Sequence, residues 1–324
     1  MTLRSLIAGI GGYLPERVLD NDALAAAYGL DTTDDWIVER TGIRRRHLAA
    51  PGETASAMGA AAARAALAHA GLDAEAVDLI VVATATPDSA FPSTAVRIQG
   101  ALGITRGFGF DVAAACTGFI YALGVADSLI RTGQARCALV IGTEVYSRIL
   151  DWTDRGTCVL FGDGAGAVVL TATDDPTERR GILSTHLHAD GRHGDILHVE
   201  GGAGSTGGTG LLRMAGKEVF RHAVSKLAAV VDEALAANGL GHEDVRWLVP
   251  HQANRRIIDA MGKKLKLPAE RVVVTVDKHA NTSAASIPLA LAEAVTTGRL
   301  ERGDLIVMEA IGGGLTWGAA LARY

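Results

Sequence analysis

The chain has 324 residues, of which 48% are hydrophobic, 21% are charged and only 5% are aromatic. This length predicts one large domain or two fused ones, with most of the chain's surface buried on folding. The net charge of -5 at pH 7 argues against nucleic acid or an anionic membrane as a partner, so an acidic partner would need a local basic patch.

Short apolar runs alternate with helical patterns from the N-terminus onward. The first apolar stretch is broken at Gly11-Gly12 and runs into a Pro-Glu-Arg turn, so we interpret it as a strand rather than a signal peptide. Residues 54–71 predict a helix, with Thr54 as its N-cap and Gly71 as its stop. No apolar run approaches the roughly 18–20 residues that span a bilayer.

The later segments continue this alternation. Strands apolar on both faces are expected at 78–87, 138–145 and 165–172, and another long helix at 219–239. The Gly/Ser/Thr stretch 200–210 predicts a mobile loop rather than a domain linker. Strands that alternate with helices predict a layered α/β fold.

The two halves of the sequence resemble each other. "DLIVVATATP" is answered by "RWLVPHQAN", "DVAAACTGFIYAL" by "VDKHANTSAASIPLAL", and "CALVIGTE" by "DLIVMEA". Asp111 and Asp277 lie 166 residues apart, as do Leu139 and Leu305. This pattern predicts a duplicated α/β unit with halves at 1–174 and 175–324, whose equivalent loops face one cleft.

The cleft loops carry one cysteine, one histidine and one asparagine. Cys116 lies where an apolar run passes into a helical pattern, and a helix start favours a thiolate with a lowered pKa. His251 and Asn281 follow the matching junctions of the second half, where they could exchange a proton or donate a hydrogen bond.

Each of these residues also has a structural interpretation. A cysteine among alanines is commonly a core residue, and we expect that of Cys137 and Cys158, which lie in strand-like runs. His251 could simply cap its loop, and Asn281 could N-cap the following helix. The cysteine spacing matches no zinc motif and favours a reducing cytoplasm.

Four motifs in order identify a family. "DVAAACTGF", "VPHQAN", "HANTSAAS" and "GGGLTWG" resemble those of β-ketoacyl-acyl-carrier-protein synthase III, the initiating condensing enzyme of bacterial fatty acid synthesis, and the resemblance runs from "GGYLPERV" to "WGAALARY". It implies a thiolase-like, duplicated αβαβα layered fold with pseudo-twofold symmetry, and a homodimer. It also implies transfer of a short acyl group, most simply acetyl, from coenzyme A, then decarboxylative condensation with malonyl-acyl carrier protein.

The same resemblance implies a role for each cleft residue. Cys116 would carry the acyl group, and its backbone N–H, with that of Gly313, would bind the tetrahedral oxyanion. His251 and Asn281 would hydrogen-bond the malonyl thioester oxygen, so that no metal or organic cofactor is needed. The clustered histidines His186, His188, His193 and His198 are typical of this family and predict no metal site.

Substrate contacts follow by the same resemblance. Trp36 and Arg155 would sandwich the adenine of coenzyme A, with Arg40 on a phosphate; helix packing is the other interpretation of Trp36. Phe91 would cross the dimer interface to wall the acyl pocket. Ile311 stands where family members commonly have Phe, which leaves open a longer or branched acyl-CoA primer.

The segment 254–267 predicts a helix with a basic face. Arg256, Lys263 and Lys266 lie opposite an apolar stripe, which suits an acidic carrier protein, although such charges are often merely solvated. The resemblance implies Arg256 as a carrier-protein contact, together with Arg221, Lys263 and Lys264.

Three other functions fit parts of the pattern. A thiolase would need a second cysteine near the C-terminus and a histidine at position 281, and this chain has neither. A cysteine hydrolase could use Cys, His and Asn, but no protease-type motif surrounds Cys116. A non-enzymatic scaffold that binds a carrier protein would not need three polar residues in the cleft.

Overall fold

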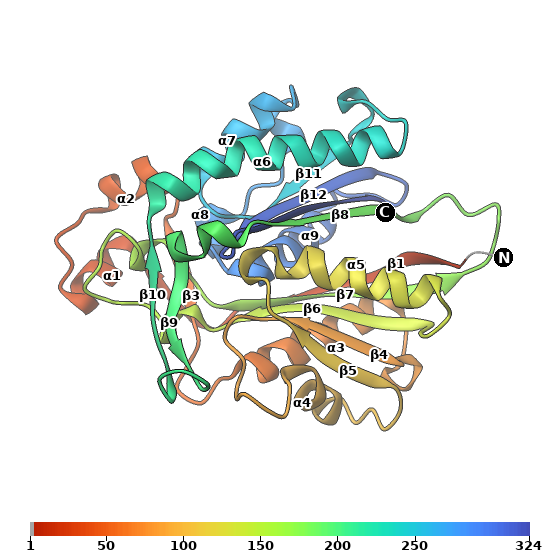
Figure 1. Cartoon of the computed structure of the whole chain (residues 1–324), viewed down its shortest axis with the longest axis horizontal. Coiled ribbons are helices and arrows are strands. Elements are labelled where there is room, and N and C mark those ends of the chain that lie inside the picture. Colours follow the sequence, from red (N-terminus) through yellow and green to blue (C-terminus); the bar gives the residue numbers. More distant parts are fainter. Residues whose placement is uncertain (1–2) are drawn as a thin grey trace.

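The computed structural model describes residues 3–324 and places two β-sheets between three layers of helices (Figure 1). Within these residues, no helix is both long enough and apolar enough to cross a membrane. The first sheet has five strands in the order β1-β7-β6-β4-β5. Their bounds are β1 Arg4–Tyr13, β7 Gly164–Thr173, β6 Cys137–Glu144, β4 Leu79–Ala83 and β5 Phe108–Val112.

The second sheet repeats the first with four strands in the order β8-β13-β12-β11. In both sheets the first two pairings are antiparallel and the third is parallel. A parallel bridge between Leu248 and Val272 stands where β5 pairs with β4 in the first sheet. The bounds are β8 Gly181–Ala189, β13 Thr316–Arg323, β12 Leu305–Gly312 and β11 Trp247–Pro250.

The helices form three layers, and those of the central layer have the most buried surface. The central helices α5 and α9 bury residues on most of their surface, as a helix packed between two sheets must. The outer helices α3 and α4 cover the first sheet, and α6 and α7 cover the second (Figure 1). Their bounds are α3 Ala55–Ala70, α4 Thr94–Ala101, α5 Gly118–Arg131, α6 Gly216–Ala237, α7 Arg255–Lys264 and α9 Ser286–Thr296.

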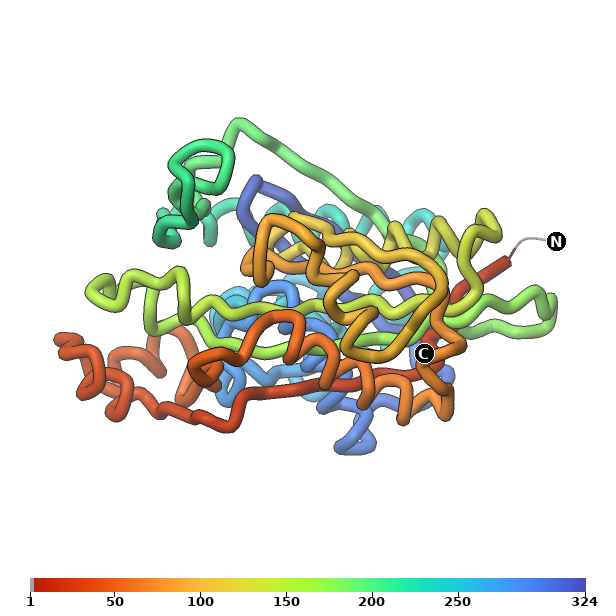
Figure 2. The backbone as a smooth tube through the Cα atoms, turned by 90° about the horizontal axis from the view of Figure 1, so that it is seen from below, coloured from red at the N-terminus to blue at the C-terminus, as the bar shows by residue number. Residues whose placement is uncertain are grey.

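Smaller elements gather at one end of the layers, and the start of β1 and the C-terminus lie toward the opposite end (Figures 1 and 2). The elements at this end are β2 Arg17–Asp20, α1 Asn21–Tyr28, α2 Asp34–Thr41, β3 Arg45–Leu48, β9 Leu197–Gly202, β10 Gly208–Met214 and α8 Val276–His279.

The predicted strands and helices are confirmed, with shifts of a few residues at their ends. Thr54 caps α3 by accepting a hydrogen bond from the Ala57 N–H, and Gly71 ends it with φ at 65°. The first apolar stretch forms β1. Cys137 lies in β6, as expected for a core residue.

Three expectations are wrong in detail. Residues 200–210 do not form one loop, because most of them belong to the hairpin of β9 and β10. Cys158 is buried, but it lies in a 3-10 turn (Cys158–Leu160) rather than in a strand. The repeat offset is 168 residues rather than 166, since Leu79 pairs with Ala138 as Trp247 pairs with Ile306.

Two short turns cross at the centre of the molecule. The 3-10 turn η2 (Ala115–Thr117) precedes α5, and η8 (Ser283–Ala285) precedes α9. Both start with a strained residue, Ala115 at φ 44° and Ser283 at φ 49°. The η2 turn packs on β12 of the second sheet, η8 packs on β6 of the first, and the two turns touch each other. The crossing gives the fold its pseudo-twofold symmetry.

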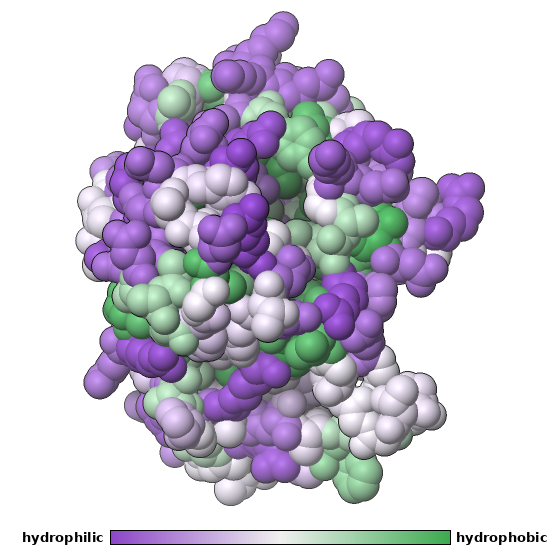
Figure 3. Space-filling model, turned by 90° about the vertical axis from the view of Figure 1, so that its left-hand side faces the viewer, coloured by the Kyte–Doolittle hydropathy of each residue, from purple (hydrophilic) through white to green (hydrophobic). Residues whose placement is uncertain are grey.

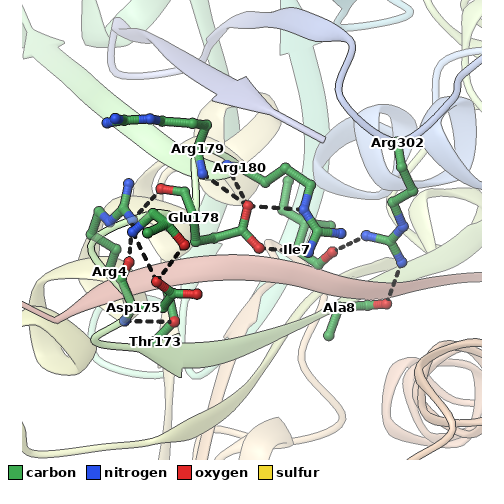
Figure 4. A network of polar contacts seen from close by, with 10 residues as sticks. Arg4, Ile7, Ala8, Thr173, Asp175, Glu178, Arg179, Arg180 and Arg302 are labelled. Atoms are coloured by element: carbon green, nitrogen blue, oxygen red, sulfur yellow. Dashed lines mark hydrogen bonds and ion pairs between the residues drawn. The ribbon is translucent and has the colours of Figure 1, made fainter.

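The chain passes from the first sheet to the second through residues 174–180, and the predicted boundary at 174/175 falls in this segment. Figure 4 shows that Arg4 of β1 donates to the carbonyls of Asp175 and Glu178 in this segment, and that Arg180 pairs with the Glu178 carboxylate within the segment at 2.6 Å. Arg302 donates to the carbonyls of residues 7 and 8 in β1. The division into two halves at this point remains a prediction.

The close crossing of the two turns requires a residue without a side chain at Gly142 in β6, and this requirement can be tested. A Cβ atom there would lie 2.2 Å from the carbonyl oxygen of Ala284, so one backbone would have to move. We expect Gly142→Ala to lower the free energy of unfolding by at least about 2 kcal/mol, measured by denaturant unfolding.

The exposed Gly100 in α4 is the matched control. No atom of residues 3–324 lies within 4 Å of a Cβ atom at that position. Gly100→Ala should therefore leave stability unchanged or raise it by up to about 1 kcal/mol, since alanine favours a helix over glycine. Similar effects of the two substitutions would contradict the close packing of η8 on β6.

Candidate active site

A cavity of about 1010 Å³ opens where the two halves meet, and Cys116, His251 and Asn281 all line it. The three residues are 4%, 4% and 6% exposed. Figure 3 looks onto the end of the molecule that carries α1, α2 and the β9–β10 hairpin, where apolar surface lies recessed among hydrophilic residues. The three residues that the sequence singled out are thus brought together from both halves.

Cys116 owes its position to a strained turn and a glycine. Ala115, just before it, has φ at 44°, a conformation that costs a non-glycine residue about 1–3 kcal/mol. A Cβ atom on Gly312 would lie 2.7 Å from the backbone nitrogen of Cys116, so the end of β12 approaches the cysteine as closely as a backbone can. Gly313, the next residue, lines the same cavity.

Burial decides the protonation state of Cys116. It raises the pKa of the thiol to about 12, although hydrogen bonds with Ser283 and Tyr146 act in the opposite direction. The expectation that the helix start would lower this pKa is therefore wrong, because loss of solvent outweighs the start of α5. The free thiol is protonated at neutral pH.

His251 is held as a neutral ring. Burial lowers its pKa to about 3, so it is uncharged at pH 7. Its Nδ1 lies 2.7 Å from the Ser286 hydroxyl, whose oxygen also accepts from the Gln252 N–H at 3.4 Å. When this hydroxyl donates its proton to Nδ1, the neutral ring carries its hydrogen on Nε2 and can act as a donor from that atom.

Asn281 is oriented by its own oxygen. Its Oδ1 accepts from the Ser283 N–H at 2.9 Å, so the amide oxygen is occupied and the Nδ2 hydrogens remain to be donated. The side chain does not N-cap α9, whose N-cap is Ala285. The backbone of Asn281 bonds Leu160 and Gly162, which lie in the first half of the chain.

Gln252 links the histidine segment to the asparagine segment. It is fully buried, and its Oε1 accepts from the N–H groups of Thr275 and Val276 at 2.8 and 3.1 Å. Its Nε2 donates to the carbonyls of Pro250 and Val273. Sequence reasoning assigned no role to Gln252 or Ser286, and only the polar character of Gln252 at the end of an apolar strand could have drawn attention to it.

The predicted coenzyme A residues gather at the mouth of the cavity. Trp36 of α2 and Arg40 line it, with the Arg40 guanidinium 4.5 Å from the indole centre. The Arg155 guanidinium lies 5.1 Å from the same ring and also donates to the Asp31 carbonyl. Arg155 itself does not line the cavity, but Gly156 does.

The two predicted acyl-pocket residues lie apart. Ile311 is 5% exposed and lines the cavity. Phe91 is 86% exposed and lies outside the cavity lining of its own chain. Its predicted place in the pocket of a second copy remains a prediction.

The predicted carrier-protein residues lie on α6 and α7. Arg256 lines the cavity, with its guanidinium 5.6 Å from the Phe220 ring. Lys263 and Lys264 are exposed farther along α7, and Arg221 is exposed on α6, where it pairs with Glu218. Lys217 also lines the cavity, a basic position that sequence reasoning missed.

Two of the clustered histidines lie outside the cavity lining and share one carboxylate, whereas His198 lines the cavity. His186 and His188 both hydrogen-bond Glu233, at 2.9 and 2.7 Å. Across residues 3–324 no group of three or more His, Cys, Asp or Glu residues is arranged to hold a metal. A reaction without a cofactor remains a prediction.

Comparisons of the sequence and of the structure with known proteins all identify the same family. Residues 110–191 match the family described as 3-oxoacyl-[acyl-carrier-protein] synthase III, and residues 235–324 match its C-terminal part. The beta-ketoacyl-[acyl-carrier-protein] synthase III of Rhodospirillum centenum is 65% identical over 325 residues, covering 100% of both chains.

Solved structures of two synthases share the fold. The Aquifex aeolicus enzyme has a TM-score of 0.93 at 48% identity, covering 99% of this chain and 100% of its own. The Pseudomonas aeruginosa enzyme also has a TM-score of 0.93, at 45% identity, and the match covers 99% of this chain and 98% of the Pseudomonas chain. These matches confirm the predicted thiolase-like layered fold, and the chain belongs to the β-ketoacyl-acyl-carrier-protein synthase III family of condensing acyltransferases, which initiate fatty acid synthesis.

Proposed function

We propose that the enzyme condenses a short acyl-CoA, most simply acetyl-CoA, with malonyl-acyl carrier protein through an acyl-Cys116 intermediate. The observation that carries this proposal is the convergence of Cys116, His251 and Asn281 on one buried cavity. The products would be a 3-oxoacyl-acyl carrier protein, coenzyme A and carbon dioxide.

In the first step, the sulfur of Cys116 attacks the acyl carbonyl. A new sulfur–carbon bond forms, the bond to coenzyme A breaks, and the thiol proton ends on the departing coenzyme A sulfur. The oxyanion that forms in between needs donors already in place. The close approach of β12 to the Cys116 nitrogen supports the backbone N–H groups of Cys116 and Gly313 in this role.

In the second step, the bond between the malonyl carboxylate and its α-carbon breaks, and carbon dioxide leaves. The electron pair moves into the thioester, whose oxygen gains negative charge. His251 and Asn281 would donate hydrogen bonds to that oxygen. The α-carbon then attacks the acyl carbonyl and expels the sulfur of Cys116 as a thiolate, which takes up one proton from solvent to restore the thiol. Fixed neutral donors in a dry site suit this step and leave no task for a metal or organic cofactor.

The cavity mouth supports binding of coenzyme A. The Arg155 guanidinium lies over the Trp36 indole, 5.1 Å from the ring centre, so adenine would insert between these flat groups by displacing the guanidinium outward. Arg40 would contact a phosphate, since it lines the cavity beside Trp36.

We also infer a homodimer in the cytoplasm. The edge strand β5 has no partner on its outer side within the described chain, and its Phe108 is 42% exposed. The 86% exposure of Phe91 supports a place in a second copy's pocket. Three free cysteines support a reducing compartment.

The assignment of the nucleophile can be tested directly. We expect Cys116→Ala to abolish acyl transfer from acetyl-CoA, because no other thiol lines the cavity. Intact-protein mass spectrometry after incubation with acetyl-CoA measures the acyl-enzyme. Cys158→Ala is the control, since Cys158 is buried outside the cavity lining, and this variant should still be acylated. Acylation or condensation by Cys116→Ala would contradict the assignment.

The division of labour between the two steps gives a second prediction. His251→Ala and Asn281→Ala should still form the acyl-enzyme but lose about 10²–10³-fold in condensation, because each removes a donor to the enolate oxygen. Ser286→Ala should lower the rate of condensation about five- to tenfold and leave acylation unchanged. This variant removes the hydroxyl that orients the His251 ring but keeps the ring itself. Release of labelled carbon dioxide measures this step. Failure of acylation in folded variants would show that the roles are wrongly divided.

Docking of the acidic carrier protein gives a third prediction. Arg256→Glu should raise KM for malonyl-acyl carrier protein at least about tenfold and leave KM for acetyl-CoA nearly unchanged, with the difference shrinking at high salt. Arg64→Glu, on the exposed face of α3 in the opposite outer layer, is the charge-matched control. Equal effects of the two reversals would argue against docking on α7.

A further inference from the structure

Strand β11 ends in a proline, and the hydrogen-bond ladder beside it stops at the same point. Leu248 forms a parallel bridge with Val272, and the Val273 N–H donates to the Leu248 carbonyl at 2.9 Å. The next bond of a parallel ladder would run from the N–H of residue 250 to the Val273 carbonyl. Pro250 has no N–H, so this bond cannot form.

The side-chain amide of Gln252 fills the gap that follows. Its Nε2 donates to the Val273 carbonyl at 3.1 Å, in place of the missing proline N–H, and to the Pro250 carbonyl at 2.8 Å. Its Oε1 accepts from the Thr275 N–H at 2.8 Å, which a continued ladder would have directed to Pro250. One side-chain amide thus stands between the two segments where their backbones would otherwise pair directly.

The same amide oxygen supports the start of α8, the turn that leads to Asn281. It accepts from the Val276 N–H at 3.1 Å, and Thr275, the N-cap of α8, makes no capping bond through its own side chain. Gln252 therefore supplies the acceptor that the first N–H groups of this turn need. Because α8 ends at His279, two residues before Asn281, the amide holds the beginning of the segment that carries Asn281 into the cavity.

Gln252 is also bound to the His251 side of the site. Its backbone N–H donates to the Ser286 hydroxyl at 3.4 Å, and this hydroxyl lies 2.7 Å from Nδ1 of His251. The Gln252 side chain is 0% exposed, and its four partners are all main-chain atoms. The amide cannot shift without leaving a buried N–H or carbonyl unpaired, so it is a rigid spacer.

The first half of the chain shows the arrangement without a spacer. There β4 and β5 pair directly at every residue, from Leu79 with Phe108 to Ala83 with Val112, and this ladder leads to the turn that carries Cys116. In the second half the segments that lead to His251 and Asn281 are held apart by an amide. A thioester oxygen has to enter between these two donors, so a fixed separation suits their proposed task.

We propose that Gln252 is a positioning residue whose amide sets the separation of His251 and Asn281, and through it the rate of decarboxylation. The inference rests on the proposed donor roles of these two residues and goes further by naming the side chain that spaces them. Acylation of Cys116 should not depend on Gln252, because none of its four main-chain partners belongs to η2 or to Gly313.

The test measures two rates in the full-length enzyme. Intact-protein mass spectrometry follows acylation of Cys116 by acetyl-CoA, and labelled carbon dioxide follows decarboxylation of malonyl-acyl carrier protein by the acetylated enzyme. Gln252→Met keeps the length of the side chain but makes none of the four hydrogen bonds. Acylation should stay within about threefold of the wild type, and carbon dioxide release should fall at least about tenfold, since small misplacements of catalytic groups are costly.

Gln252→Glu adds a pH profile that lost stability alone would not produce. The protonated carboxyl keeps an acceptor and one donor, whereas the carboxylate places an oxygen that cannot donate against the carbonyls of Pro250 and Val273. Burial raises the pKa of such a carboxyl, so the competent protonated form is present at low pH and is lost as the pH rises. Carbon dioxide release, relative to the wild type at the same pH, should fall at least about tenfold between pH 6 and pH 8.5. Division by the wild-type rate removes the ionisation of Glu309, whose pKa burial raises to about 8.

Two substitutions are matched controls. Gln134→Glu makes the same chemical change at an exposed position beyond the end of α5, and its ratio to the wild type should not vary with pH. Thr143→Val removes a buried hydrogen bond to the Ala55 carbonyl, so it should lower the melting temperature without changing the ratio of carbon dioxide release to acylation.

Two outcomes would overturn the inference. One is an unchanged ratio of carbon dioxide release to acylation in folded Gln252→Met. The other is a wild-type ratio at both pH values in Gln252→Glu, which decides the matter if Gln252→Met does not fold. A wild-type enzyme that is acetylated but releases no carbon dioxide from malonyl-acyl carrier protein would instead overturn the proposed function, and the inference with it.

Discussion

The crossed packing of two strained turns is the constraint on which the active site depends. The η2 turn carries Cys116 and rests on β12 of the other half, while η8 follows Asn281 and rests on β6. Glycines at 142 and 312 allow both approaches, because a Cβ atom at either would strike the facing backbone. Neither half can complete the cavity alone. The strain at Ala115 and Ser283 persists because each turn is held by the opposite half.

Burial at this crossing keeps the resting catalytic residues uncharged. At neutral pH the Cys116 thiol is protonated, since burial raises its pKa to about 12, and the His251 ring is neutral, since burial lowers its pKa to about 3. Burial also raises the pKa of the Glu309 carboxyl, in the strand beside His251, to about 8. In the proposed reaction, negative charge would therefore arise in the cavity mainly during the two steps, on sulfur or on the thioester oxygen. Donors already in place are strongest under those conditions.

Sequence reasoning reached the layers of the fold and the three polar cavity residues, because apolar runs, caps and motifs are local signals. It misjudged features that depend on tertiary contacts. The offset of 166 aligned Asp111 with Asp277, but sheet register, which sequence similarity alone does not determine, makes it 168. The direction of the Cys116 pKa shift depends on burial by the other half. The hydrogen bond from Ser283 to Tyr146 joins residues 137 apart in the sequence, and no local signal predicts it.

Basic and apolar side chains both line the cavity, and they suit different parts of the substrates. Arg40, Lys217 and Arg256 lie among its lining residues, and within the described chain these are its only arginine and lysine side chains. On a protein of net charge -5, such a local basic patch would attract a coenzyme A phosphate at Arg40 and an acidic carrier protein at Arg256, as proposed above. The buried side chains Val159, Phe161, Leu212 and Ile311 line the same cavity and are apolar. In the proposed reaction the basic residues would attract the carriers, and the apolar side chains would contact the acyl group. Substitutions among the apolar side chains would therefore change the contacts of the acyl group and leave the charges that attract the carriers in place.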